Sequence, residues 1–184
     1  MLLPTLEFIS KLLEKHINDA NVDVAIQSAR KLTDPGNPAG IVISLINIQE
    51  ETSLRNTSNV RRTPLGTEYI EPPVFVNLYL LFAFDFAKYD TALAHLSRTI
   101  EFFQARRWFS AENGTAQNPF PTELQKLTFE MVNLGFEEVN NLWSVLGGTY
   151  LPSVVYKVRL LRIQAADAVA APEITTIGLE LMRR

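Results

Sequence analysis

The sequence predicts an α/β protein, equally describable as α+β: a single-domain mixed sheet with packed helices, an extended loop and a C-terminal arm. Residues 74–86 are apolar at nearly every position, as in a strand buried on both faces of a sheet. Three other segments, 6–17, 93–103 and 136–146, repeat apolar residues every three or four positions, as helices do. A length of 184 residues suits one domain. We therefore expect a domain over residues 1–164 and an arm over residues 165–184.

The first third of the chain predicts a helix followed by two strands. Apolar residues from Leu6 to Ile17 form one stripe of a helix that ends near Asn18, and Pro4 suits its first turn. Residues 22–32 then alternate loosely, residues 34–38 form a dense turn signal, and residues 41–48 are mostly apolar. The simplest arrangement of these two strands is a β-hairpin.

Residues 49–73 have mixed charge and no apolar period, which predicts a long functional loop. The strand 74–86 follows, with even-numbered residues on one face and odd-numbered residues on the other, and it belongs in the middle of a covered sheet. Asp90 is placed to cap the next helix, whose stripe ends near Arg107. That stripe consists of Leu93, Leu96, Ile100 and Phe103.

The last third predicts a loop over 110–122, a strand over 124–132, a helix over 136–146 and a strand over 152–163. Glycines 147 and 148 are suited to end the helix, because glycine adopts left-handed geometry at little cost. The last strand carries Lys157 and Arg159 on a wetter face. Beyond it, residues 174–181 are prone to form a strand.

Composition excludes several classes of function. The formal net charge is −3, which argues against nucleic-acid binding and a polybasic membrane anchor. The absence of cysteine excludes thiol catalysis, thiolate metal sites and disulfides. Residues 74–87, the longest apolar stretch, are too few for a membrane-spanning helix, and residues 1–16 do not match a signal peptide. We expect no direct membrane span.

No pattern in the sequence predicts catalysis. His16 is expected at a helix end and His95 on a solvated surface, so the two do not form a ligand pair. The glycines form no phosphate-binding loop, and adjacent carboxylates diverge in regular structure. Asp85 is the one acid that keeps a small carboxylate-based hydrolase open, although a local cap or turn role is favoured. We expect no enzyme activity, no cofactor and no metal.

Several spaced segments resemble a known family when they are taken together. They are Glu51-Thr52-Ser53-Leu54-Arg55-Asn56, Pro72-Pro73 leading into residues 77–82, residues 96–104, Leu142-Trp143, Leu146-Gly147 and residues 152–158. In this order and spacing they are similar to the tail-terminator, or cap, family of phage-tail-like contractile injection systems. The resemblance covers residues 5–163.

The resemblance implies a structural protein without enzyme activity. It implies a homohexameric ring that closes the inner tube and the contractile sheath, with the sheath and inner-tube proteins of the same particle as partners. Such a protein would be cytoplasmic at assembly, and the sequence leaves open whether the particle is released or anchored to a membrane. A monomeric adaptor and the carboxylate-based hydrolase stay open as alternatives.

A closed ring needs complementary patches on each subunit, and loops and exposed strands supply them. The loop 49–73 and the arm have too little apolar periodicity to fold on themselves, which favours ordering on a neighbour. The predicted partner-contact residues are Arg55, Arg61, Arg62, Lys157, Arg159, Ile174, Ile177 and Leu179.

Overall fold

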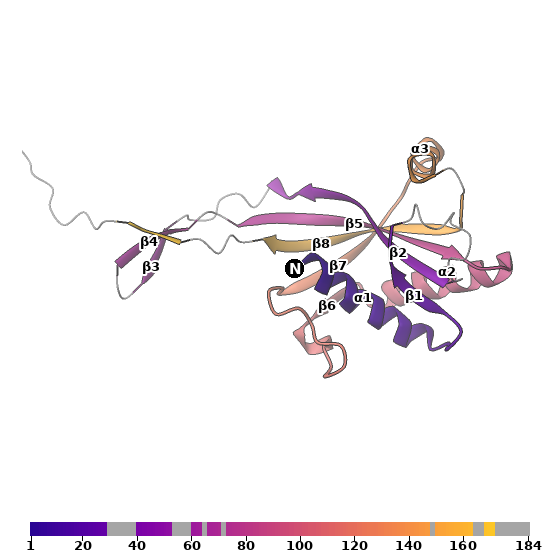
Figure 1. Cartoon of the computed structure of the whole chain (residues 1–184), viewed down its shortest axis with the longest axis horizontal. Coiled ribbons are helices and arrows are strands. Elements are labelled where there is room, and N and C mark those ends of the chain that lie inside the picture. Colours follow the sequence, from indigo (N-terminus) through magenta and orange to yellow (C-terminus); the bar gives the residue numbers. More distant parts are fainter. Residues whose placement is uncertain are drawn as a thin grey trace, which may run out of the picture.

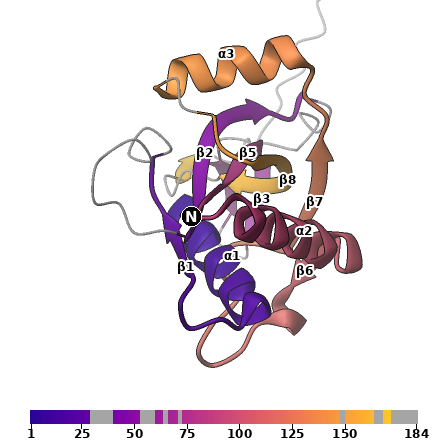
Figure 2. The ribbon, with the colours of Figure 1, turned by 90° about the vertical axis from the view of Figure 1, so that its right-hand side faces the viewer.

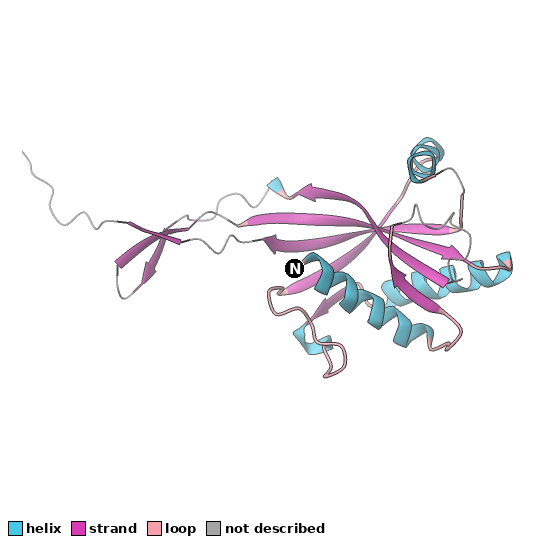
Figure 3. Cartoon of the chain, viewed as in Figure 1, coloured by secondary structure: helices cyan, strands magenta, loops and turns pink. Residues whose placement is uncertain are grey.

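The computed structural model describes residues 1–28, 40–52, 60–63, 66–70, 73–147, 150–163 and 168–171. These residues form an α+β fold with a mixed six-stranded sheet and a smaller three-stranded sheet, which confirms the predicted fold class (Figures 1 and 3). The helices are α1 (Leu2–Ile17), α2 (Tyr89–Ala105) and α3 (Phe136–Leu146), with a short 3-10 helix η3 (Ala111–Asn113). The large sheet contains, in spatial order, β1 (Asp23–Ile26), β2 (Gly40–Glu50), β5 (Val74–Asp85), β8 (Ser153–Ile163), β7 (Lys126–Val132) and β6 (Trp108–Ser110). The small sheet contains β3 (Val60–Thr63), β4 (Gly66–Ile70) and β9 (Ala168–Ala171).

Strand β5 lies in the middle of the large sheet, as its apolar sequence predicts. Its residues Leu78, Leu80 and Phe82 are buried under α1 and α2, within the larger hydrophobic core. Its residues Leu81 and Ala83 are buried on the opposite face in a second cluster. Figure 2 shows α1 and α2 on one side of the sheet and α3 on the other. The alternation predicted for this strand is confirmed.

The second cluster is smaller because α3 has 11 residues and crosses one end of the sheet. Trp143 is the buried residue of α3, and it packs near Val42, Leu81 and Val155. The helix ends at Gly147, whose φ of 122° strongly favours glycine. Phe136, predicted to lie on the apolar stripe, is instead 98% exposed.

The predicted β-hairpin over residues 22–48 is wrong, because β1 and β2 pair in parallel, with Asp23 opposite Gly40 and Ile26 opposite Ile43. Parallel strands need a connection of about a dozen residues, and residues 27–39 supply that length. A turn signal in the sequence shows where a strand ends, but it does not show whether the next strand pairs with it in parallel or antiparallel. Gly40 is required at the close approach, because a Cβ there would lie 2.5 Å from the Asp23 carbonyl oxygen.

The prediction of a long loop over residues 49–73 is also wrong, because this stretch contains the hairpin of β3 and β4. These strands and β9 continue three strands of the large sheet in the same order, β2 with β3, β5 with β4 and β8 with β9. Val74 pairs with Ile163 in the large sheet, and Ile70 pairs with Ala168 in the small one. The strand order of the small sheet therefore matches that of β2, β5 and β8 in the large sheet.

Strand β8 contains a bulge that reverses part of its predicted pattern. Val158 pairs with Leu78 and Leu161 pairs with Val76, so β8 advances three residues while β5 advances two. The extra residue turns Leu161 into the core, although alternation places it on the wetter face. Arg159 stays on the face that carries Lys157, because the alternation is reversed only at Leu161, after Arg159.

Helix α2 buries a different stripe from the predicted one. It begins at Tyr89 with Lys88 as its N-cap residue, so Asp90 lies in the first turn and is not the cap. Leu93 is exposed, and His95 is 5% exposed against a prediction of a solvated histidine. The His95 ring stacks on Phe86 with centroids 4.8 Å apart. The buried residues of the helix are Ala92, His95, Thr99, Phe102 and Phe103.

Replacing Phe82 by alanine should lower the free energy of unfolding by about 3–5 kcal/mol, because the ring fills the core between Phe103 and Tyr156. Denaturant unfolding followed by circular dichroism measures this change. Phe136→Ala is the matched control, since that side chain is exposed and its loss should change stability by less than about 0.5 kcal/mol. Equal effects of the two substitutions would contradict the assignment of the core.

Burial lowers the pKa of His95, Arg98 lowers it further, and Asp19 acts in the opposite direction. The folded protein therefore holds the neutral imidazole while the unfolded chain takes up a proton near the ordinary value of 6.5. Stability is then complete above that value and falls as the pH drops below it. His95→Phe should flatten the change in unfolding free energy between about pH 7.5 and about pH 5.5. An unchanged pH profile in His95→Phe would contradict this role of His95.

Candidate interaction surface

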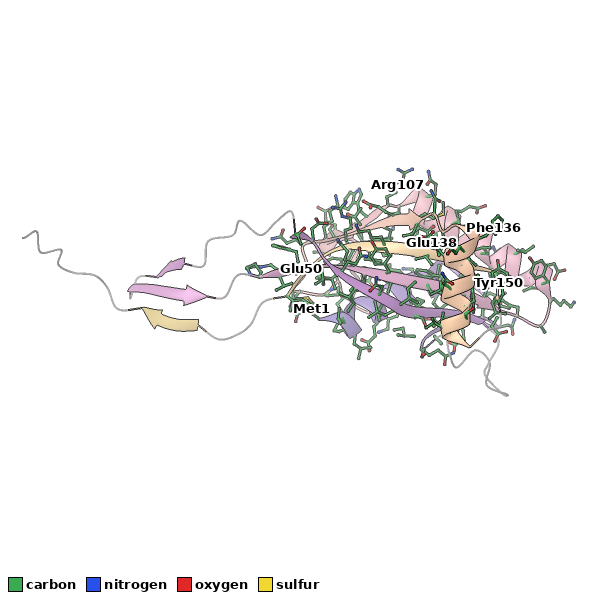
Figure 4. The ribbon with its side chains drawn as sticks, turned by 90° about the horizontal axis from the view of Figure 1, so that it is seen from above. Met1, Glu50, Arg107, Phe136, Glu138 and Tyr150 are labelled. Atoms are coloured by element: carbon green, nitrogen blue, oxygen red, sulfur yellow. The ribbon has the colours of Figure 1, made fainter. Side chains whose placement is uncertain are left out.

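One half of the large sheet carries polar side chains on the same face as α3, beyond the part of that face that α3 covers. This half lies where β2 and β8 end and where β5 begins, and Figure 4 shows α3 crossing the sheet well away from Glu50. Alternate residues of a strand share a face, so odd-numbered residues of β5 lie beside Gln49, Lys157 and Arg159. We call this region the polar sheet face; it consists of Gln49, Glu51, Asn77, Tyr79, Glu130, Lys157 and Arg159.

Hydrogen bonds and ion pairs join four strands across the polar sheet face. The guanidinium of Arg159 lies 3.2 Å from Glu51 Oε2 and 3.3 Å from Glu130 Oε1. Asn77 Nδ2 donates a hydrogen bond of 3.0 Å to the same Glu51 oxygen. Tyr79 donates a hydrogen bond of 2.8 Å to Gln49 Oε1. Arg159 therefore connects β8 to the residue after β2 and to β7.

Asn77, Lys157 and Arg159 differ in how deeply they are buried and in the groups that they contact. Asn77 is 2% exposed, its amide nitrogen is bonded to Glu51, and its Oδ1 has no hydrogen-bond partner. Lys157 lies over the Tyr79 ring, with Nζ 6.0 Å from the centroid, which is a weak cation–π contact. Arg159 is paired with two carboxylates of its own chain, so its charge stabilises the sheet and is less available for an ion pair with another protein.

A groove of about 580 Å³ adjoins the polar sheet face beside β7. Pro73, Phe75 and Thr128 line it together with Lys126, Glu130 and Arg159. Its mixture of charged and apolar groups suits contact with a protein surface better than binding of a small apolar ligand. Lys126 is also held over the Trp108 ring at 4.9 Å.

The structure brings together only part of the predicted contact set. Lys157 and Arg159 lie two residues apart on one strand, while Arg61 and Arg62 lie on β3 of the small sheet, opposite Glu68 and Thr67. Four predicted contact residues lie outside the described residues: Arg55, Ile174, Ile177 and Leu179. The β-prone segment 174–181 lies outside them too, whereas residues 168–171 of the arm form β9 against β4 of the same chain.

Sequence reasoning missed the exposed aromatic residues around α3. Phe136 is 98% exposed and Tyr150 is 61% exposed, and both line a hollow of about 510 Å³ with Trp143. A Phe directly after Gly135 at the first helical position is the signal that could have indicated exposure, because the first turn projects beyond the packed layer. The Gly135 N–H donates to Glu138 Oε2 at 2.8 Å, which fixes that end of the helix.

The residues that were considered as candidates for catalysis or metal binding lie apart from the polar sheet face. Within the described residues, no group of three or more His, Asp or Glu side chains could hold a metal ion. Asp85 is the last residue of β5, opposite Gly40, and it lines none of the grooves described above. His16, as predicted, lies in the last turn of α1, with its ring 4.6 Å from that of Phe102. Over the same residues, no helix has the length and apolar character needed to cross a membrane.

Comparison with known proteins identifies a family, and solved structures are among the similar proteins. The family described as Pvc16 N-terminal domain matches residues 5–176. The tube terminator in "Cryo-EM Structure of an Extracellular Contractile Injection System, PVC sheath/tube terminator in extended state" is similar with a TM-score of 0.62 and 14% identity over 96% of the chain. The anti-feeding prophage cap, described as the AFP tube terminating cap, is similar with a TM-score of 0.66 and 17% identity over 94% of the chain. No curated protein sequence matches.

The match spans only part of these solved chains. It covers 63% of the PVC terminator and 58% of the anti-feeding prophage cap. At these identities the similarity shows a common fold. It includes the sheet and all three helices, since nearly the whole of the present chain is covered.

Proposed function

Because the chain belongs to the Pvc16 N-terminal domain family, we propose that it is a structural terminator of a contractile injection particle. In this proposal six copies form a ring that closes the inner tube and the contractile sheath. The observation that carries it is the similarity of nearly the whole chain to a tube terminator and to a tube terminating cap. The family resemblance predicted from the spaced segments is confirmed by the family match.

The physical requirement of a terminator is a subunit with unlike faces. An open stack of rings keeps presenting a binding surface until a ring covers it and offers no such surface on its other side. The chain meets this requirement, because helices α1 and α2 cover one face of the sheet while the other carries α3 and the polar sheet face. This asymmetry supports a role at the end of a particle.

The polar sheet face and the small sheet are the regions that we assign to tube or sheath contact. Arg61, Arg62, Lys157 and Arg159 would supply charge complementarity there, and Arg55 would join them from the segment before β3. Such charges affect specificity and salt dependence more than affinity. Because Arg159 is already paired with Glu51 and Glu130, Lys157 is expected to be the more responsive of the two cations on β8.

Loss of this protein should leave tubes and sheaths of irregular length, or sheaths that fall apart from the uncapped end. The reason is that an uncovered ring continues to bind subunits or to lose them. Particle lengths in a deletion strain, measured by electron microscopy and compared with those of the complemented strain, test this expectation. A narrow, unchanged length distribution with intact sheaths would rule out the terminator role.

Removal of residues 165–184 should weaken attachment to the particle and leave the large sheet folded. None of the six strands of the large sheet lies in this segment, whereas β9 does. A second, shorter truncation removes residues 172–184 only and keeps β9, so it separates the effect of these residues from the effect of losing β9. If Ile174, Ile177 and Leu179 add a strand to a neighbour, both truncations should release the cap at lower salt than the full chain. Normal capping by both truncated chains, or unfolding of either, would contradict a docking role for the arm.

A further inference from the structure

Helix α3 and its surroundings present an apolar surface that is exposed among the described residues. Phe136 and Tyr150 are exposed at the rim of a hollow whose floor includes Val139 and Trp143. Figure 4 shows Phe136, Glu138 and Tyr150 on the outer layer, over the sheet. We call Leu134, Phe136, Val139, Trp143 and Tyr150 the α3 patch. Exposed clusters of this kind mark interaction sites.

Trp143 holds the α3 patch to the sheet. It is the buried residue of α3 and packs in the second cluster with Leu81 and Val155. Its ring also packs near that of Tyr150, with ring centroids 5.8 Å apart. A partner that fits this patch therefore needs an apolar contact surface.

A groove of about 630 Å³ lies on the opposite side of the sheet, between α1, α2 and the loop that contains η3. Its apolar floor is formed by Leu12 and Phe102. Asn118 donates a hydrogen bond of 3.0 Å to the Phe8 carbonyl, which holds the loop against α1. We call this the α1–α2 groove; its lining includes Lys11, Leu12, Lys15, His16, Phe102 and Arg106.

The charges of these two surfaces are complementary. The first turn of α3 carries Glu137 and Glu138 beside Phe136. The α1–α2 groove carries Lys11, Lys15 and Arg106 against the single acid Glu112.

We propose that the α3 patch of one copy docks in the α1–α2 groove of the next copy, with Phe136 as the anchor. This inference rests on the proposed ring and assigns its subunit contact. The two surfaces are different and lie on opposite sides of the sheet, so their contact is head-to-tail, the type that closes a ring by rotation. A symmetric dimer would instead bury the same patch twice.

Continuation of the large sheet from one copy to the next is a poorer route to such a ring. Its edge strand β6 has 3 residues, and the other edge strand, β1, has 4. Helix α1 also reaches β1, where Ser10 donates a hydrogen bond of 2.6 Å to the Val24 carbonyl. Short, covered edges resist pairing with another chain. Contact through side chains, as between the α3 patch and the α1–α2 groove, is therefore more favourable than pairing of the edge strands of the large sheet.

Disulfide cross-linking tests the contact directly, because the chain has no cysteine of its own. A chain carrying both Asn140→Cys, an exposed position that lines the same hollow and leaves Phe136 in place, and Lys15→Cys should form, on oxidation, a ladder of covalent species larger than a dimer. A mixture of the two single variants should give covalent dimers. The control replaces the groove position by Ala94→Cys, an exposed position on α2 outside the groove, and should give no ladder.

Association measured by native mass spectrometry supplies the second readout. Phe136→Ala should weaken assembly by roughly thirty-fold, as expected for an aromatic anchor, while thermal unfolding of the subunit stays unchanged. Glu137→Lys and Lys15→Glu should each weaken assembly, and their combination should restore part of it, because the pair is again of opposite charge.

The outcomes separate this inference from the proposed function. Six-membered rings in the parent chain, with no cross-linked ladder and full assembly of Phe136→Ala, would overturn the inference and leave the ring in place. A parent chain that stays monomeric both in solution and on the particle would overturn the ring and the inference together.

Discussion

Burial of β5 on both faces is the constraint on which the rest of the structure depends. Residues such as Phe82 and Leu81 point to opposite sides and are both fully buried, so each side of the sheet needs a cover. Helices α1 and α2 cover one side along most of its length, and α3 covers one end of the other. Toward its beginning β5 becomes polar, at Asn77 and Tyr79, at the place where α3 no longer reaches. The position of the polar sheet face therefore follows from the place where α3 crosses the strands (Figure 4).

The same end of the sheet is where β2 and β8 end and β5 begins. The network around Arg159 connects the residue after β2 with β5, β7 and β8 there. A cross-strand network is worth more in stability than a single exposed ion pair, because its members hold one another in place. The network therefore stabilises the end of the sheet that α3 does not cover.

The two sides of the large sheet differ in their surface chemistry. The charged groups of the polar sheet face pair with one another across strands, an arrangement that stabilises a sheet. The α3 patch and the α1–α2 groove lie on opposite sides of the sheet. In the proposed terminator, this difference would keep the contact with a neighbouring copy distinct from the contact with the stack.

The sequence by itself determined the helices α1 and α3, the strands β5, β7 and β8, and the family, because each depends on local periodicity or on the order of motifs. The tertiary structure decided what periodicity does not contain. The parallel pairing of β1 with β2 depends on the path that the chain takes between the two strands. The bulge at Arg159 depends on the register of β8 against β5. The burial of His95 and the exposure of Phe136 depend on how far each helix reaches over the sheet. Local patterns give the side of a helix that can be buried, but only packing against a second element determines which residues on that side are covered.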